Sequence, residues 1–255
     1  MNQYLLHFSP TGGTRTCASL LADCWPDPWQ EIDLTDVSRD FSALSFAQDD
    51  LVLVAVPSYG GRVPGPAAER LAKIQGGGAR AILLCVYGNR AFEDTLIELE
   101  DVLLAAGFRC AAAVAAIAEH SIFRQFASGR PNQHDRSDLA DFGARIRARL
   151  DEPASDTPVQ VPGSRPYNKF SGVPMKPRTR LCGCTHCGAC ARACPSGAIS
   201  HANPKYLDKE KCISCMRCLT VCPRHLRYIS RPMLAAAAAG LNAACSSYKN
   251  NELFL

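Results

Sequence analysis

The sequence predicts a doubly wound α/β domain with a parallel five-stranded sheet, followed by a small α+β module rich in cysteine. Over the first 150 residues, short apolar runs alternate with helix-length amphipathic segments, as in right-handed strand–helix–strand units whose sheet is covered on both faces. Nine of the 14 cysteines then fall between Cys182 and Cys222, at spacings typical of metal binding. A chain of 255 residues can hold one buried core and a second, smaller module.

The first domain is placed at residues 1–150 and is expected to contain five strands and four helices. The strands are predicted at 4–8, 30–34, 50–57, 80–87 and 110–117, and the helices at 13–23, 64–74, 93–106 and 135–150. The last strand has the weakest pattern, because five of its eight residues are alanine, which favours helix.

Three further segments follow this domain. Residues 151–178 carry six prolines, which exclude a long helix and predict an extended linker. Tyr167 and Phe170 give this linker a reason to pack on the first domain. The cysteine-rich module is placed at 179–231, and the tail at 232–255 contains an alanine-rich stretch that predicts a short helix.

Charge is distributed unevenly along the chain. Residues 1–150 carry 14 Lys and Arg against 18 Asp and Glu, whereas residues 178–231 carry 10 against 2. No apolar stretch approaches the roughly 20 residues that span a bilayer, so no membrane span is expected. The first residues, "MNQYLLHF", lead into a strand without a basic start or a small-residue cleavage site, which predicts a cytoplasmic protein.

The cysteines form an internal duplication. "CTHCGACARACP" (184–195) and "CISCMRCLTVCP" (212–223) align residue for residue, 28 positions apart. Each copy resembles the bacterial ferredoxin run, in which three cysteines hold one [4Fe–4S] cluster and the fourth holds the other. The resemblance implies two clusters, with Cys184, Cys187, Cys190 and Cys222 around one and Cys212, Cys215, Cys218 and Cys194 around the second.

Three questions stay open in this module. Zinc is the less favoured metal, because zinc sites usually use two separated cysteine pairs and need no third cysteine followed by Cys-Pro. Cys182 lies outside the repeat and could substitute as a ligand. The basic residues either offset the negative charge of the clusters or form a docking surface for an acidic electron partner, which the first domain itself could be. No nucleic-acid-reading motif accompanies the charge. The basic residues in question are Lys205, Lys209, Lys211, Arg217, Arg224 and Arg227.

The turn "SPTGGT" follows the first predicted strand and precedes the first predicted helix. A helix N-terminus offers unpaired N–H groups to a phosphate without a lysine, and hydroxyl side chains add donors. The triphosphatase loop is absent, and so is the dinucleotide fingerprint, although Asp33 leaves nicotinamide as a less favoured alternative. The phosphate-binding candidates are Ser9, Thr11, Gly12, Gly13 and Thr14.

This turn resembles the phosphate loop of flavodoxins, and two later stretches match the flavin loops of that family in order. "PSYGGRVP" (57–64) follows the third strand, and "YGNRAFED" (87–94) follows the fourth. The resemblance implies a flavodoxin-like sheet of order 2-1-3-4-5 with FMN at the carboxyl ends of its strands. Tyr59 and Tyr87 could stack on the flavin, and Arg62 and Arg90 border its mouth. The implied flavin-loop residues are Pro57, Ser58, Tyr59, Gly60, Gly61, Tyr87, Gly88, Asn89 and Arg90.

Together, the two halves resemble flavodoxin–ferredoxin fusion proteins. The resemblance implies electron transfer between the clusters and FMN, with a redox protein such as a ferredoxin, a hydrogenase or another oxidoreductase as partner. An alternative is an FMN-dependent reductase of a small organic acceptor, such as a quinone or an unsaturated compound. A redox or iron sensor ranks last, because no output domain is visible. His120 and Arg124 follow the fifth strand, where a substrate could lie, although a structural role for them is favoured.

Overall fold

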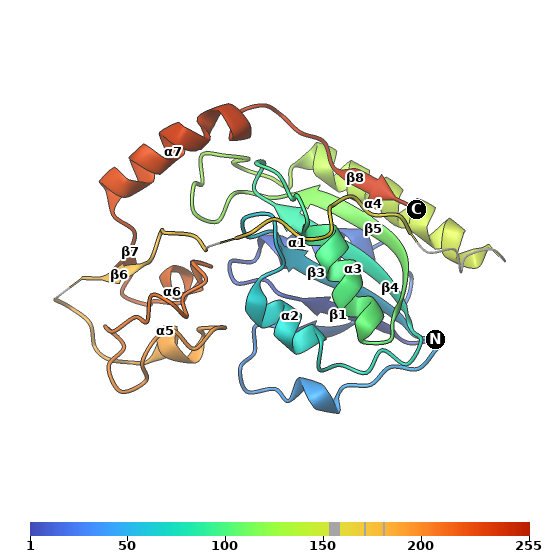
Figure 1. The fold of residues 1–255 in the computed structure, drawn as a ribbon, viewed down its shortest axis with the longest axis horizontal. Coiled ribbons are helices and arrows are strands. Elements are labelled where there is room, and N and C mark those ends of the chain that lie inside the picture. Colours follow the sequence, from blue (N-terminus) through green and yellow to red (C-terminus); the bar gives the residue numbers. More distant parts are fainter. Residues whose placement is uncertain (153–158, 171, 181) are drawn as a thin grey trace.

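The computed structural model describes residues 1–152, 159–170, 172–180 and 182–255. Pro153 and Pro158 of the predicted linker lie outside the described residues. Figure 1 shows a large lobe built around one sheet and a smaller lobe that contains the cysteine repeat. A helix from the tail, α7 (Arg231–Cys245), forms an arch between the two lobes.

The sheet of the large lobe has the order β2-β1-β3-β4-β5-β8. The first five strands are parallel, which confirms the predicted flavodoxin-like order 2-1-3-4-5. The sixth was not predicted: β8 comes from the end of the tail and pairs antiparallel with β5. The strands are β1 (Gln3–His7), β2 (Gln30–Asp33), β3 (Leu51–Pro57), β4 (Arg80–Tyr87), β5 (Arg109–Ile117) and β8 (Glu252–Phe254).

Helices cover both faces of this sheet, as its apolar strands require. One face packs against α2 (Gly65–Leu71) and α3 (Thr95–Ala105), and the other against α1 (Gly13–Ala22) and α4 (Gln133–Asp151). A short 3-10 helix, η1 (Phe41–Ala43), lies between β2 and β3. Within the described part of the chain, no helix is long and apolar enough to cross a membrane.

The small lobe repeats its local structure as its sequence does. It consists of β6 (Arg178–Thr179), α5 (Ala189–Arg192), α6 (Arg217–Thr220) and β7 (Arg227–Tyr228), with β6 and β7 paired antiparallel. Helices α5 and α6 are four residues each and follow left-handed residues, Gly188 (φ 71°) and Met216 (φ 64°), at equivalent positions of the two repeats. The duplication in sequence is therefore a duplication in backbone conformation.

The segment between the lobes packs along the large lobe. Arg165 Nε lies 2.9 Å from an oxygen of Asp101 on α3, and the Tyr167 hydroxyl donates to the same carboxylate. The backbone N–H of Asn168 donates to Asp94 at 2.6 Å. These contacts hold the described part of this segment against the first domain, as was predicted from Tyr167.

Candidate functional site

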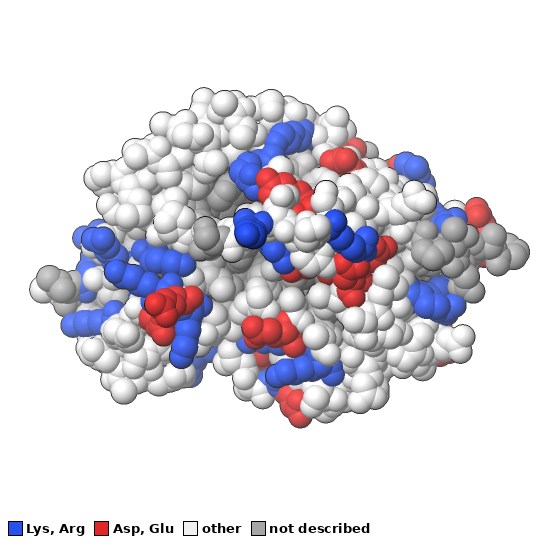
Figure 2. Space-filling view, viewed as in Figure 1, with Lys and Arg blue, Asp and Glu red and all other residues white. Residues whose placement is uncertain are grey.

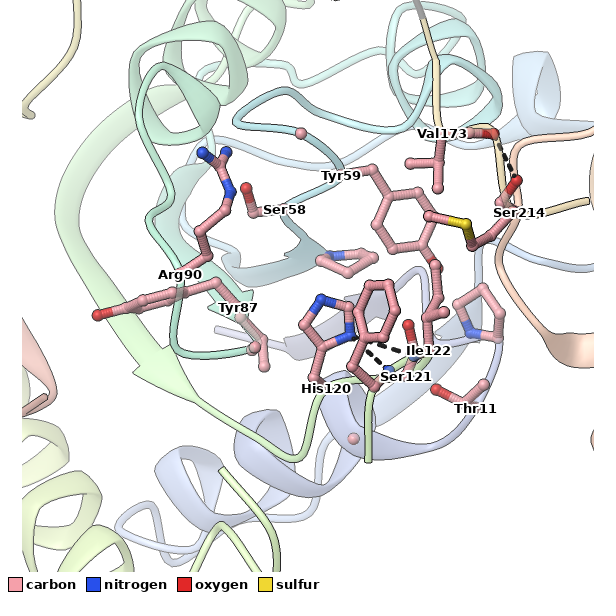
Figure 3. Close-up of a pocket in the computed structure, with 18 of the residues that line it drawn as sticks. Thr11, Ser58, Tyr59, Tyr87, Arg90, His120, Ser121, Ile122, Val173 and Ser214 are labelled. Carbon is pink, nitrogen blue, oxygen red and sulfur yellow. Dashed lines mark hydrogen bonds between the residues drawn. The ribbon is translucent and has the colours of Figure 1, made fainter. Parts of the chain in front are cut away.

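A cavity of about 260 Å³ lies where β1, β3, β4 and β5 end (Figure 3). Its wall comes from the loops that follow these four strands, including the predicted phosphate turn and both predicted flavin loops. Open α/β sheets bind ligands at this position, beside the strand where the order reverses. A second part of its wall comes from outside the first domain and is described below.

The phosphate turn presents the start of α1 to this cavity. Gly12 caps the helix in the left-handed conformation (φ 98°) and makes no side-chain cap bond, so the N–H groups of Gly13 and Thr14, the first two of the helix, are available to a ligand. Thr11, Gly13 and Thr14 line the cavity. Ser9 does not line it, since its hydroxyl accepts a bond of 2.9 Å from the Arg15 N–H and braces the turn.

The loop after β3 contributes Tyr59 as a wall of the cavity. Its side chain is enclosed between the cavity and the small lobe, and burial raises the pKa of Tyr59 well above its ordinary value. Ser58 also lines the cavity and accepts a bond of 2.8 Å from the Thr95 hydroxyl. Gly60 faces Phe170, because a side chain at position 60 would clash with that ring.

The loop after β4 divides its residues between two tasks. Tyr87, Gly88 and Arg90 line the cavity. Asn89 does not, because its amide donates to the carbonyl oxygens of Cys245 and Ser247, at 2.6 and 2.8 Å. Asn89 therefore anchors the end of α7.

Ten of the fourteen predicted flavin-site residues line the cavity, and four do not. The four are Ser9, Gly12, Gly61 and Asn89. Arg62, expected at the mouth, pairs with both carboxylate oxygens of Glu98 and lies over the Tyr167 ring, so it braces the fold. Arg90 pairs with Glu93 while it borders the cavity.

His120 projects into the middle of the cavity (Figure 3). Its Nδ1 accepts from the backbone N–H groups of Ile122 and Phe123, at 3.1 and 3.3 Å. Burial lowers the pKa of His120 to about 4. The ring is therefore neutral at pH 7, and its one proton sits on Nε2, as a donor toward the cavity.

We expect stability to depend on pH through His120. Because its folded-state pKa is depressed, the unfolded chain takes up a proton first as the pH falls, and stability present above about pH 6.5 is lost towards pH 4. Acidification from about pH 7 to about pH 5 should lower the free energy of unfolding through this group by about 2 kcal/mol. Urea unfolding at both pH values should show a smaller loss for His120→Gln than for the unsubstituted chain. Equal losses would contradict the assignment.

The remaining wall of the cavity comes from three segments outside the first domain, whose lining residues were not predicted. Val173 and Met175 come from the linker, Ile213 and Ser214 from the second cysteine repeat, and Leu241 from α7. The Ser214 hydroxyl donates to the Val173 carbonyl at 3.0 Å, which fixes the repeat to the linker (Figure 3). An apolar cluster continues this roof. It joins Phe123, Phe126, Met175, Met216, Ile229 and Cys245.

The cysteines line two separate cavities in the crossed pattern that the ferredoxin resemblance implies. Cys182 lines neither of the two. Among the described residues, no three His, Cys, Asp or Glu side chains converge as they would around a single metal ion. The outer cavity is lined by Cys184, Cys187, Cys190 and Cys222, and the inner cavity by Cys194, Cys212, Cys215 and Cys218.

The inner cysteine cavity adjoins the cavity of the first domain. Ile213 lines both of them, and Ser214 and Cys215 follow it on opposite sides of the same wall. The outer cysteine cavity shares no lining residue with the cavity of the first domain. The three cavities thus lie in the order outer cysteine set, inner cysteine set, first-domain cavity.

Arg227 is a buried cation beside both cysteine sets. It is 5% exposed, and its Nη2 lies 3.5 Å from the Cys190 sulfur of the outer set. Burial raises the pKa of Cys218, in the inner set, to about 12, and the Arg227 charge opposes that shift. Its Nη1 is buried without a protein partner among the described residues, so it is free to donate to a ligand in the outer cavity.

The comparisons with known proteins concern mainly the small lobe. Residues 183–226 match the family model of the 4Fe-4S dicluster domain. A ferredoxin-like protein in the nif region of Sinorhizobium fredii is 45% identical over 47 residues, which are 16% of this chain and 73% of that protein. A trichloroethene reductive dehalogenase of Dehalococcoides mccartyi is 42% identical over 55 residues, 16% of this chain and 10% of that protein. This chain spans 6%, 10% and 33% of the length of three curated relatives.

Solved structures with a similar first domain include two flavodoxins. A flavodoxin of Streptococcus pneumoniae is 18% identical with a TM-score of 0.43, over 58% of this chain and 99% of that one. An archaeal flavodoxin is 14% identical with a TM-score of 0.44, over 60% of this chain and 100% of that one. The fold assignment itself rests on the strand order of the sheet.

Proposed function

The chain joins a flavodoxin-like domain to a 4Fe-4S dicluster ferredoxin domain, and we propose that it relays electrons between two [4Fe–4S] clusters and FMN. The observation that carries this proposal is the wall shared by the inner cysteine cavity and the first-domain cavity. If the clusters and a cofactor in the first domain did not exchange electrons, the two cavities would not need to be adjacent. When bound, the clusters supply one-electron steps, and FMN can take up one electron or two.

The cysteine cavities fit clusters by the chemistry of their donors. Each is lined by four thiols, the donor set of a [4Fe–4S] cluster. We propose the outer set, Cys184, Cys187, Cys190 and Cys222, as ligands of one cluster, and Cys194, Cys212, Cys215 and Cys218 as ligands of the other. Burial raises the pKa of the Cys215 thiol to about 12, so a thiolate there depends on bound metal for its charge compensation.

The first-domain cavity fits FMN through its backbone. The N–H groups of Gly13 and Thr14 at the start of α1, with the Thr11 and Thr14 side chains beside them, would hold the phosphate. Tyr59 and Tyr87 would supply apolar walls for the ring, and the Nε2–H of His120 would donate a hydrogen bond inside the cavity. The roof from the linker, the second repeat and α7 would exclude water from this site.

Anaerobic reconstitution tests this proposal directly. We expect about eight iron atoms, about eight sulfides and one FMN per chain. Stopped-flow reduction by a one-electron donor should then reduce the iron–sulfur chromophore before the flavin. Zinc in place of iron, or a chain that binds no flavin, would contradict the proposal.

Arg227 gives a prediction about the outer cluster. Replacing it by Gln removes a buried positive charge 3.5 Å from a ligand sulfur, so the added electron is less stabilised. We expect Arg227→Gln to lower the reduction potential of one cluster by on the order of 100 mV. Potentiometry followed by electron paramagnetic resonance measures this shift. Arg227→Lys should keep most of the potential, and Arg231→Gln, an exposed cation nearby in sequence, should leave it unchanged.

A second candidate function is reduction of a small organic acceptor at the flavin. His120 favours it, because a neutral imidazole whose N–H faces the cavity could donate a hydrogen bond to an acceptor oxygen on which negative charge develops during reduction. Steady consumption of a quinone or an unsaturated acid by the reconstituted chain, lost in His120→Gln, would support the reductase. Reversible reduction without turnover would support the carrier.

A further inference from the structure

We propose that the exposed basic face around the outer cysteine cavity docks a small acidic one-electron carrier protein, which exchanges electrons there. This inference rests on the proposed electron-transfer function. We call this surface the distal face and define it by Arg180, Arg192 and Arg224, all of which are exposed. The small lobe is predominantly basic in Figure 2.

The two cysteine sets differ in their access to solvent. In the outer set, Cys187 is exposed, and Cys184 and Cys222 are half-buried. In the inner set, Cys194, Cys215 and Cys218 are buried, and Cys212 is half-buried. An external protein that exchanges electrons with this chain therefore meets the outer set first.

The cations of the distal face surround this exposed set. Arg224 lines the outer cavity itself, and Arg192 Nη1 donates to the Cys187 carbonyl at 3.0 Å. The backbone N–H of Arg180 donates to the carbonyl of Leu226, which also lines the cavity, and the Arg180 guanidinium lies over the Tyr228 ring, 5.6 Å from its centroid. The distal face therefore places positive charge around the point at which an electron would enter or leave.

The small lobe contains few acidic residues. Between residues 178 and 231 the chain contains only Asp208 and Glu210 as acids. They lie in one turn with Lys209 and Lys211, and Glu210 lines a groove on the side of the first domain. Among the described residues, neither carboxylate forms an ion pair with Arg180, Arg192 or Arg224, and Asp208 lies instead 4.0 Å from Lys211. The distal face therefore keeps its attraction for an acidic protein.

The first domain does not occupy this face. Between residues 1–150 and 178–231 of the described chain, the one ion pair joins Arg217 to Asp33 at 3.9 Å. Arg217 also reaches the carbonyls of Ser9 and Pro10, at 3.5 Å, next to the phosphate turn. The basic residues of the small lobe therefore form two groups with different positions. Arg217 and Arg227 lie at the domain contact and beside the clusters, whereas the distal cations face solvent.

Exposed cations contribute little to the energy of a partly buried cluster, because water and salt screen them. They contribute much more to association, where a field of one sign raises the rate at which an oppositely charged protein arrives. The chemistry that fits this face is therefore an acidic surface surrounding a one-electron centre. A nucleic acid could bind the same positive charge. It would exchange no electrons with the cysteine set that this charge surrounds.

The test compares the holoprotein with charge-reversal variants. The probe is a reduced plant-type [2Fe–2S] ferredoxin, a small acidic carrier, and stopped-flow absorbance gives the second-order rate constant. Raising the salt from low concentration to about 0.5 M should slow the unsubstituted protein about 10-fold or more. Arg180→Glu combined with Arg224→Glu should slow it about 10-fold at low salt and remove most of the salt dependence. Binding of the oxidised proteins to immobilised oxidised ferredoxin should weaken in parallel.

The matched control is Arg136→Glu combined with Arg145→Glu, which makes the same change of net charge on α4, far from the small lobe. It should leave both rate and binding close to those of the unsubstituted protein.

Photoreduction by 5-deazaflavin, which needs no docking, reports on the cofactors separately. Normal photoreduction with unchanged ferredoxin kinetics in Arg180→Glu/Arg224→Glu would overturn the docking proposal alone. Failed photoreduction of the unsubstituted protein would overturn the proposed function. Preferential binding of a DNA duplex over ferredoxin, weakened by the same variant, would replace the carrier by nucleic acid.

Discussion

Replacing Cys218 by alanine should separate the outer cluster from the flavin. The Cys218 side chain is 8% exposed and lines the inner cavity, which shares its wall with the first-domain cavity. Without this thiolate we expect the inner cluster to be lost, so that about four of eight iron atoms remain. Flavin should still bind, because its cavity contains no side-chain atom of Cys218. Reduction of the flavin by a one-electron protein donor should fall below detection, while the outer cluster is still reduced.

Iron, sulfide and flavin analysis, together with stopped-flow traces at separate iron–sulfur and flavin wavelengths, measures this outcome. Cys182→Ala is the matched control, since Cys182 is exposed, near the outer set in sequence and absent from both cysteine cavities. It should keep both clusters. Loss of iron in Cys182→Ala, or full flavin reduction in Cys218→Ala, would overturn the assignment of ligands and of order.

Four of the five parallel strands, β1, β3, β4 and β5, were predictable because each is a short apolar run between helix-length segments. Strand β2, with the sequence QEID, contains a single apolar residue and has a weaker pattern. Strand β5 formed in spite of its alanines, since it is buried between β4 and β8 and small side chains suffice there. Tertiary context outweighed the local preference for helix. Strand β8 was not predictable, because three residues at the end of a polar tail carry no periodic pattern. Its partner, the outer edge of β5, is visible only in the folded sheet.

The positions of the loops were predictable, but the direction of individual side chains was not. Asn89 and Gly88 are neighbours in the same motif, yet one holds α7 and the other lines the cavity. The left-handed backbone at Asn89 (φ 66°) turns its amide away from the cavity, and no sequence pattern fixes that turn.

The roof of the first-domain cavity had a signal in the sequence that was not used for the prediction. Between its cysteines the second repeat has Ile213, Met216 and Leu219, where the first has Thr185, Gly188 and Ala191. Apolar side chains at equivalent positions predict that the second repeat is covered and the first is more open. The structure covers the second repeat with the first domain and α7.

Replacing Asp135 by alanine should destabilise the large lobe and loosen the tail. Asp135 is fully buried and forms an ion pair with Arg130, which is 8% exposed. It also accepts from the Asn132 N–H at 2.7 Å, which completes the capping box of α4, and from the Asn251 amide at 2.9 Å. Burial alone would raise the pKa of Asp135, but these partners outweigh it and hold the pKa below its ordinary value. Removing the carboxylate leaves a buried guanidinium unpaired, which costs about 3–5 kcal/mol.

The same substitution should also weaken FMN binding, because Asp135 and Arg130 hold the tail in place. Asn251 joins Asp135 to β8, and Arg130 donates to the Lys249 carbonyl at 2.8 Å, so both partners hold the chain that follows α7. Leu241 of α7 forms part of the roof of the first-domain cavity. Urea unfolding of Asp135→Ala should therefore show the loss of stability, and flavin fluorescence should show weaker FMN binding at temperatures where the chain is still folded.

Asp138→Ala, on the same helix, removes one bond to Asn251 of 2.8 Å from a partly exposed carboxylate and should cost about 1 kcal/mol or less. Equal losses in the two variants would show that the buried pair does not govern stability, and unchanged FMN affinity in a destabilised Asp135→Ala chain would show that α7 stays in place without it.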